Sequence, residues 1–394
     1  MGGILELVVC AAGVVVAGGN GDERPRLREL GWGPGRFEPG PLNAITDVRG
    51  VRVGQVTVRE EGICTGVTAI LPHGDNLYAN KVRAATFVGN GFGKLVGTTQ
   101  VAELGTLETP ILLTGTLSTF RVADHLVGWM LDQPGNEELR SINPVVGETN
   151  DGWLSDIRRR PITAEHVKKA LESAETGPVE EGCVGAGTGT RCLGYKGGVG
   201  TASRRVVLEK KSVMIIPPVG PGSDRFQVPW HGHTVGVIVQ TNFGGTLTVG
   251  GVVVGPGLLD ESTASHPPVD RDGSCMIVVA TDAPLDARQL ARLSRRAIYA
   301  MARVGASYSH GSGDYAISFS TPKEGADGPL PDRLLSPLFE ATLECVEEAI
   351  LNSMLRAQTT EGQQGRVSRA IDIDLLVARL RGGGLPVHPP GEGR

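Results

Sequence analysis

Aromatic side chains are scarce in this sequence, since phenylalanine, tryptophan and tyrosine together make up only 4% of the 394 residues. Nucleic-acid-binding proteins present basic patches, and single-strand binders add aromatic side chains on which bases stack. The formal net charge here is −5, and the short run Arg158–Arg160 has no aromatic partners beside it. We therefore expect no nucleic-acid partner and interpret the arginine run as a solvated helix end.

Signatures of several common enzyme classes are missing as well. The six cysteines form no CxxC pair, and neither His231 nor His233 lies in an HExxH-type motif, so no metal ion is predicted. The glycine-rich stretch Cys183–Ser203 fits neither a phosphate-binding loop nor a dinucleotide fingerprint, which favours a loop that lines a site. No GxSxG motif is present. No cofactor is predicted, and a Cys183–Cys192 disulfide stays open.

Long apolar runs are also absent, because the segment Leu7–Ala17 is too short to span a bilayer. It resembles the apolar part of a signal peptide, with Val15–Ala17 as a small-residue cleavage signal, but no Lys or Arg precedes it. A mis-assigned start or a disordered extension is the alternative. We expect a leader over 1–23 and a single domain over 24–394, cytoplasmic or exported, without a membrane partner.

Glycine is abundant, with 57 residues, and 40% of the side chains are hydrophobic, which is enough for a large core. β-Branched runs bounded by Gly, Pro or Asp predict strands, and apolar residues at helical spacing predict helices. The predicted strands are Val51–Val58, Gly66–Leu71, Ile111–Leu113, Val206–Leu208, Ser212–Ile216, Thr234–Gln240, Leu247–Val254, Met276–Ala280 and Tyr315–Ser320, and the predicted helices are Val122–Leu131, Ala164–Ala174, Ala287–Arg303 and Pro337–Leu351. Asp286 and Ser336 are expected to cap the last two helices. Strands that follow one another through glycine turns predict an α+β protein with largely antiparallel sheets covered by helices.

A serine stands at the start of one of these strands. Ser274 follows Asp272-Gly273 and precedes the apolar run Cys275–Ala280. A turn leading into a buried strand is the ordinary interpretation of this pattern. The alternative is a nucleophile held at a strand end, with Cys275 as a buried strand residue.

Other polar residues lie at the ends of apolar segments. Asn242 ends a predicted strand, and Glu148 and Asn150 follow the apolar Pro-Val-Val segment. Ser312 and Asp314 are two residues apart, so an extended backbone would display a hydroxyl and a carboxylate on one face. Each of these patterns alone is also typical of an ordinary turn.

Taken together, the motifs resemble those of the DmpA-like peptidases, which include L-aminopeptidase/D-esterase enzymes and β-peptidyl aminopeptidases. The resemblance extends from about Arg24 to about Leu380. The segments that carry it are Gly40–Gly54, Gly105–Ile111, Gly185–Gly189, Lys196–Arg204, Gly273-Ser274, Ala280–Pro284 and Gly311–Asp314. The number of these ordered blocks makes the resemblance specific.

The resemblance implies a fold and a maturation step. Family members are four-layer αββα sandwiches similar to N-terminal-nucleophile hydrolases, with a distinct strand connectivity. Their precursors cleave themselves at a Gly-Ser bond, which is Gly273-Ser274 here. The products would be an α chain that ends at Gly273 and a β chain over 274–394, and the αβ units would assemble as homotetramers.

The resemblance also implies roles for the polar residues. Ser274 matches the nucleophile, Asn242 the side-chain donor to the oxyanion, and Ser312 and Asp314 the hydroxyl–carboxylate pair that contacts the nucleophile. Glu148 matches the acid that holds the substrate's free amino group, and Asn150 stands where some members have a tyrosine. These roles predict a metal-independent aminopeptidase that acts on short peptides, aminoacyl amides or esters.

The base that activates the serine is left open by the sequence. After cleavage, the α-amine of Ser274 would titrate at about 7.7–8.0, close to working pH. Before cleavage this nitrogen belongs to an amide, so Ser312 and Asp314 are candidates for that step and for turnover. An amine acyltransferase similar to the ornithine acetyltransferases, which use a threonine nucleophile, and a non-catalytic binding homologue are the alternative functions.

Overall fold

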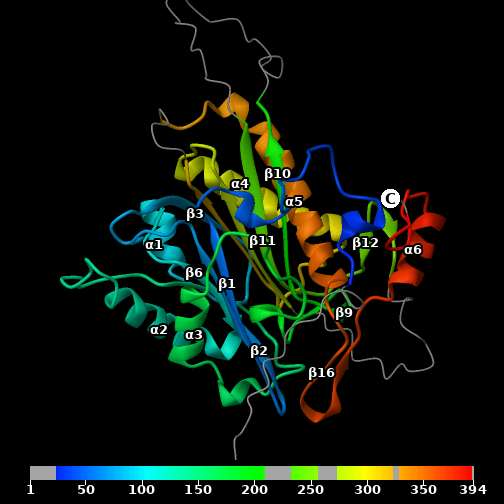
Figure 1. Cartoon of the computed structure of the whole chain (residues 1–394), viewed down its shortest axis with the longest axis horizontal. Helices are drawn as coiled ribbons and strands as arrows, with labels where there is room; N and C mark the ends of the chain where they lie inside the picture. Colours follow the sequence, from blue (N-terminus) through cyan, green and yellow to red (C-terminus); the bar gives the residue numbers. More distant parts are fainter. Residues whose placement is uncertain (1–23, 209–231, 256–272, 323–327, 393–394) are drawn as a thin grey trace, which may run out of the picture.

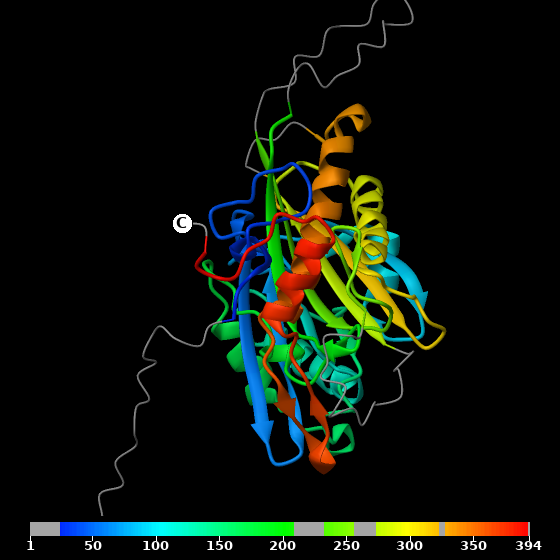
Figure 2. The same cartoon turned by 90° about the vertical axis from the view of Figure 1, so that its right-hand side faces the viewer.

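The computed structural model describes residues 24–208, 232–255, 273–322 and 328–392. Two β-sheets lie face to face in these residues, and helices cover both outer faces (Figures 1 and 2). The predicted leader, His231 and the predicted strand Ser212–Ile216 lie outside the described residues.

The first sheet has five strands in the order β1-β2-β6-β7-β4. Their bounds are Arg52–Glu60 for β1, Ile63–Leu71 for β2, Ile111–Gly115 for β6, Val145–Thr149 for β7 and Leu95–Val96 for β4. Helices α2 (Thr119–Leu131) and α3 (Ala164–Glu172) pack on its outer face through one apolar cluster. The short helix α1 (Thr98–Leu104) follows β4.

The second sheet has six strands in the order β10-β11-β14-β15-β3-β5. Their bounds are Val199–Val206 for β10, His233–Asn242 for β11, Ser274–Thr281 for β14, Gly313–Ser320 for β15, Val82–Gly91 for β3 and Thr106–Leu107 for β5. Helices α4 (Ala287–Met301) and α5 (Ser336–Leu355) cover its outer face, and α6 (Ile373–Gly382) belongs to the same apolar cluster. Strand β14 pairs antiparallel with β11 and parallel with β15.

Strand β14 explains why the two sheets form a sandwich. Its alternate residues Cys275, Ile277 and Val279 pack in the cluster with α4 and α5. The residues between them, Met276 and Val278, pack in the cluster between the two sheets. A strand buried on both faces is apolar at successive positions. The helix–sheet–sheet–helix layering confirms the predicted αββα architecture.

Two predicted strands were wrong in their bounds. The segment Leu247–Val254 is a hairpin of β12 (Thr248–Val249) and β13 (Val252–Val253), because Gly250 and Gly251 both have positive φ. Of the segment Val206–Leu208, only Val206 belongs to a strand, as the last residue of β10. Strand β10 lacks a β-branched run because it packs closely on α5: a Cβ on Gly200 would lie 2.0 Å from Ala349 O.

The helix starts agree with the prediction in one case and differ in the other. Asp286 caps α4, since its side chain accepts a hydrogen bond from Gln289 N. Ser336 is the first residue of α5 and makes no cap hydrogen bond, while Pro337 occupies the first turn. The remaining short strands are β8 (Arg191–Cys192), β9 (Tyr195–Lys196), β16 (Thr360–Glu361) and β17 (Val367–Ser368).

Candidate active site

The predicted nucleophile is the first residue of the central strand β14. Ser274 is 5% exposed, and its neighbours across the sheet are Asn242 of β11 and Gly313 of β15. Its Oγ lies 2.7 Å from the carbonyl oxygen of Gly273 and donates a hydrogen bond to it. The hydroxyl is therefore adjacent to the carbonyl group that the predicted self-cleavage would attack.

A second donor reaches the same carbonyl oxygen. Gly313 N donates a hydrogen bond to Gly273 O at 3.0 Å. The backbone at Gly273 also has no room for a side chain, because a Cβ there would lie 2.3 Å from Asn242 O and 2.5 Å from Phe243 Cα. Glycine at position 273 thus lets the chain pass close enough to β11 to place its carbonyl between Ser274 Oγ and Gly313 N.

Asn242 ends β11 directly beside Ser274 and is 9% exposed. Its Oδ1 accepts a hydrogen bond from Arg191 N at 2.9 Å. Because a backbone N–H requires an acceptor, this bond fixes which end of the amide is the oxygen. The amide nitrogen Nδ2 is left as the donor end, which is what an oxyanion ligand requires.

Ser312 and Asp314 flank Gly313 and are both buried. The Ser312 hydroxyl donates to Asp314 Oδ1 at 2.9 Å, and Asp314 Oδ2 has no hydrogen-bond partner among the described residues. Burial raises the pKa of Asp314 from 3.8 to about 6, with the Ser312 hydroxyl and the Cys275 backbone acting in the opposite direction. Within the described part of the chain, neither side chain is hydrogen-bonded to Ser274 Oγ, so direct contact with the nucleophile stays a prediction.

Glu148 reaches this cluster from the other sheet. It lies in β7, is 2% exposed, and accepts hydrogen bonds at Oε1 from Lys94 N at 2.9 Å and Lys94 Nζ at 3.3 Å. Gly93 passes between Glu148 and β15: a Cβ on Gly93 would lie 2.9 Å from Glu148 Oε1 and 3.2 Å from Gly313 Cα. The structure therefore brings Glu148 close to the residue that binds the Gly273 carbonyl.

These strand ends combine the Ser274 hydroxyl, the Gly273 carbonyl with its two hydrogen-bond donors, the Asn242 amide and a buried carboxylate that is paired with the Lys94 ammonium group. A comparison with family models matches residues 43–368 to peptidase family S58. The chain belongs to peptidase family S58. It is a hydrolase, an aminopeptidase, as the pattern of motifs predicted.

Several known proteins are similar to this S58 peptidase in sequence and in fold. A beta-peptidyl aminopeptidase BapA from Sphingosinicella microcystinivorans is 37% identical, over 92% of this chain and 93% of its own length. The PH0078 protein from Pyrococcus horikoshii has a TM-score of 0.79 at 42% identity, covering 92% of this chain and 100% of that structure. The L-aminopeptidase D-Ala-esterase/amidase from Ochrobactrum anthropi has a TM-score of 0.76 at 34% identity, with 92% and 99% covered, and is described as a new variant among the Ntn hydrolase fold.

Asn150, the second residue predicted to bind substrate, is exposed and two residues beyond Glu148. Its Oδ1 accepts a hydrogen bond from Gly152 N at 3.0 Å, which closes a local turn. A tyrosine at another position, Tyr315, lies next to Gly93 and Glu148. A Cβ on Gly93 would be 3.2 Å from Tyr315 Cε2 and 2.9 Å from Glu148 Oε1. Burial and then the Glu148 carboxylate raise the pKa of Tyr315. Asn150 thus stays a prediction, and Tyr315 is a site residue that the sequence did not suggest.

The glycine-rich stretch contacts the candidate site through Arg191, and its predicted role in lining a site stays a prediction. Arg191 within it supplies the backbone N–H that orients Asn242, and Lys196 is fully buried with Nζ donating to the carbonyls of Gly187 and Gly197. Burial lowers the pKa of Lys196. The cysteines of this stretch, Cys183 and Cys192, are both free in the described part of the chain.

Sequence reasoning missed three features of the S58 site. These are the Gly313 N–H, Lys94 and Tyr315. Lys94 lies just beyond β3, a strand that the sequence did not predict, and Gly313 has no side chain that would indicate a role. The segment Gly91-Phe-Gly-Lys94 is the sequence feature that could have indicated Lys94, because its glycines allow the backbone to pass close to other strands. Its position in the fold, however, depends on β3, which was not predicted.

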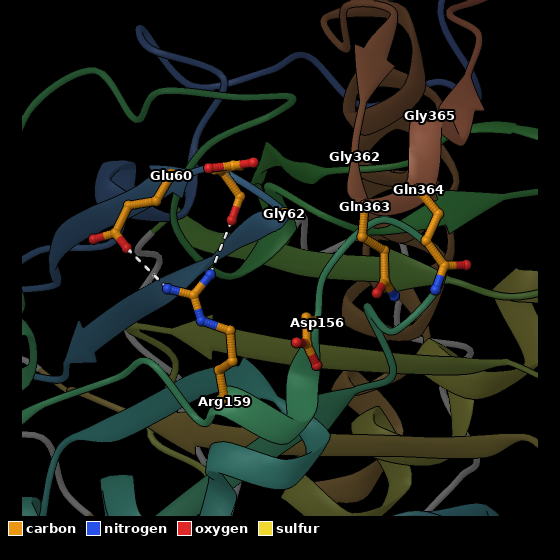
Figure 3. Close-up of a pocket in the computed structure, with 9 residues that line it drawn as sticks. Glu60, Gly62, Asp156, Arg159, Gly362, Gln363, Gln364 and Gly365 are labelled. Carbon is orange, nitrogen blue, oxygen red and sulfur yellow. Dashed lines mark hydrogen bonds and ion pairs between the residues drawn. The ribbon is translucent and has the colours of Figure 1, made fainter.

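A pocket elsewhere on the molecule has a different lining. It lies between the β1–β2 turn and the segment 362–365, has a volume of about 680 Å³, and contains none of the predicted site residues. Figure 3 shows the Arg159 guanidinium, which lines this pocket, directed at the Glu60 carboxylate. The two side chains form an ion pair at 3.6 Å. The described residues contain no cluster of His, Cys, Asp and Glu suited to a metal ion. None of the helices in the described ranges has the length and apolar character that crossing a membrane requires.

Proposed function

We propose that this S58 aminopeptidase is a serine enzyme that matures by cleaving its own Gly273-Ser274 bond. The observation that supports this most directly is the position of the Gly273 carbonyl, whose oxygen receives hydrogen bonds from both Ser274 Oγ and Gly313 N. A hydroxyl beside the preceding carbonyl, with a backbone donor on the carbonyl oxygen, is the arrangement that an acyl shift to oxygen requires.

The cleavage proceeds in two balanced steps. Ser274 Oγ attacks the carbonyl carbon of Gly273, and the bond from that carbon to Ser274 N breaks as the nitrogen takes up a proton. The resulting ester is hydrolysed by water, which gives a Gly273 carboxylate and a β chain whose first residue is Ser274. The Gly313 N–H holds the negative charge that develops on the carbonyl oxygen, and the same donor remains in place for later substrates.

During turnover, the same Ser274 hydroxyl attacks the carbonyl carbon of the substrate's N-terminal residue. Asn242 Nδ2 donates to the oxyanion, and the amine leaving group takes a proton as the acyl-enzyme forms. Water then releases the N-terminal residue. The proton acceptor is either the new α-amine of Ser274 or the Asp314–Ser312 pair, and the raised pKa of Asp314, about 6, supports its taking part.

Glu148 supplies the preference for a free N-terminus. A carboxylate that is 2% exposed and one glycine away from Gly313 is suited to hold the substrate's ammonium group while the adjacent carbonyl reaches Ser274. We propose short peptides, aminoacyl amides and esters as substrates, with Asn150 at the outer edge of the pocket. We also propose that the αβ units assemble as homotetramers.

Intact-mass analysis of the purified protein tests the proposal. We expect two chains that separate at Gly273/Ser274, together with hydrolysis of aminoacyl p-nitroanilides. Ser274→Ala should remain one chain and lose activity by at least about 10⁴-fold, as for other serine enzymes that lose the nucleophile. A wild-type chain that stays whole while hydrolysing these substrates would refute self-processing, and processing without any hydrolysis would point to a binding protein.

A further inference from the structure

The Glu148 carboxylate already has a cation beside it. Lys94 Nζ lies 3.3 Å from Glu148 Oε1 and also donates to Thr116 Oγ1 at 2.8 Å. The Lys94 backbone N–H donates to the same Oε1 at 2.9 Å. Two hydrogen bonds therefore join Lys94 to Glu148, and a third fixes the Lys94 ammonium group to Thr116.

Each partner keeps one unused position. Among the described residues, Glu148 Oε2 accepts no hydrogen bond, and Lys94 Nζ uses two of its three N–H groups. The Lys94 side chain is 36% exposed, whereas the Glu148 side chain is 2% exposed. A ligand that reaches this pair thus meets a carboxylate oxygen and an ammonium group side by side.

The charges at this position disfavour a ligand that is only a cation. A substrate ammonium on Oε2 would share one carboxylate with the Lys94 ammonium, and the two positive charges would repel each other across a few ångströms. A ligand that also carries a carboxylate on the same carbon atom avoids this repulsion, because its negative charge lies opposite Lys94. An ammonium and a carboxylate on one carbon are the charged part of a free amino acid.

We infer that Lys94 is a specificity-determining residue that directs the aminopeptidase toward substrates whose amine-bearing carbon also carries a carboxylate. This inference rests on the proposed role of Glu148 as the amine site. In such a substrate the reacting carbonyl belongs to the side chain, so the substrate class is the β-aspartyl isopeptides and amides. The ammonium binds Glu148 Oε2, and the α-carboxylate takes the remaining N–H of Lys94.

Two pairs of compounds isolate this one charge. β-Aspartyl p-nitroanilide differs from β-alanyl p-nitroanilide only by the carboxylate on the amine-bearing carbon. L-Asparagine and β-alaninamide form the same pair without a chromophore, and their binding can be measured by calorimetry. For each protein, kcat/KM is measured for the first pair and Kd for the second. Both members of a pair are tested on the same preparation, so that the fraction of active protein cancels in the kcat/KM ratio.

The Lys94→Met variant removes the charge and keeps an unbranched apolar side chain. We expect the ratio of kcat/KM for β-aspartyl over β-alanyl substrate to fall by about tenfold, because Lys94 no longer attracts the carboxylate or repels the lone ammonium. KM for β-alanyl p-nitroanilide should fall, and KM for β-aspartyl p-nitroanilide should rise. Lys94→Arg, which keeps the charge, should preserve the wild-type preference.

Lys81 offers a matched control at the other end of β3. Its Nζ lies 3.5 Å from Glu108, with side-chain exposures of 35% and 7% that are close to those of the Lys94–Glu148 pair. Lys81→Met should leave the substrate ratio unchanged. If Lys94→Met also leaves both the kinetic and the binding ratio unchanged, the inference is wrong. A protein that hydrolyses neither p-nitroanilide contradicts the proposed function alone, because the calorimetric ratio still decides the role of Lys94.

Discussion

The two sheets contribute different kinds of chemistry to the S58 site. The six-stranded sheet brings Ser274 and Asn242 together with Asp314, a buried carboxyl group whose side-chain hydrogen-bond partner is the Ser312 hydroxyl. The five-stranded sheet brings Glu148, a buried carboxylate that is paired with the Lys94 ammonium. One group is suited to exchanging a proton near neutral pH, and the other to holding a charge.

This difference separates the expected effects of mutation. Changes at the six-stranded sheet should alter the chemical step, because we propose that its groups act on the carbonyl that reacts. Changes at the Glu148–Lys94 pair should alter the affinity for a charged N-terminus and leave the chemical step closer to the wild-type rate. Variants on the two sides therefore test whether the division holds.

Among variants that keep the Ser274 nucleophile, the largest effect is expected from Asn242→Asp. The carboxylate can still accept the hydrogen bond from Arg191 N, but it has no N–H for the oxyanion. We expect kcat to fall by about 10²–10³-fold with a small change in KM, as when one oxyanion donor is removed. Steady-state kinetics with an aminoacyl p-nitroanilide measure this, and a rise in KM at unchanged kcat would contradict the assignment.

Glu148→Gln should have a smaller effect than Asn242→Asp, and it should change KM more than kcat. The neutral amide keeps the shape of the side chain and loses the attraction for an ammonium group, so we expect KM to rise by about 10–100-fold. The value of kcat should change much less than in Asn242→Asp. Glu108→Gln, at the control pair with Lys81, should leave both parameters unchanged. A loss in kcat alone would place Glu148 in the chemical step instead.

The sequence was sufficient for the elements that have strong local signals. The apolar run of β14, the Asp286 cap of α4 and the helical spacing in α5 all reflect neighbouring residues, and the αββα layering followed from the family resemblance. Strand β10 had no such signal, because its small residues serve close packing under α5 and its Arg204 is buried against Glu344 and Glu348. Those partners are 140 residues away or more along the chain.

The site shows the same limit. Ser274, Asn242, Ser312, Asp314 and Glu148 were predicted because the family resemblance marks them. The structure places the first four at neighbouring strand ends of one sheet, with Glu148 of the other sheet close to Gly313 across Gly93. The ion pair with Lys94 depends on how β3, β4 and β7 meet, and the Gly313 donor is a backbone group with no side chain to signal it. Contacts of this kind arise from tertiary structure, so residue identity alone does not reveal them.

The smallest expected effect concerns stability and its dependence on pH. Burial raises the pKa of Asp314 from 3.8 to about 6, so the folded protein holds this proton more tightly than the unfolded chain does. Below pH 3.8 both states are protonated and the group contributes nothing to the pH dependence. As pH rises from 3.8 to 6 the unfolded chain loses the proton first, and the wild-type protein loses stability until the folded state is ionised as well.

Asp314→Asn removes this titration. We expect the free energy of unfolding of the variant, relative to that of the parent, to increase by about 2 kcal/mol between pH 4 and pH 7 and then to level off. Urea unfolding of the single-chain Ser274→Ala protein, with and without the change, measures this difference and cancels the titration of the other buried acids. Asp332→Asn is the control, because hydrogen bonds from Arg288 and Gln289 lower the pKa of the exposed Asp332 to about 2, so its difference should be flat over the same range. A flat difference for Asp314→Asn would mean that its carboxyl group titrates as in the unfolded chain and is not poised to act as a base near neutral pH.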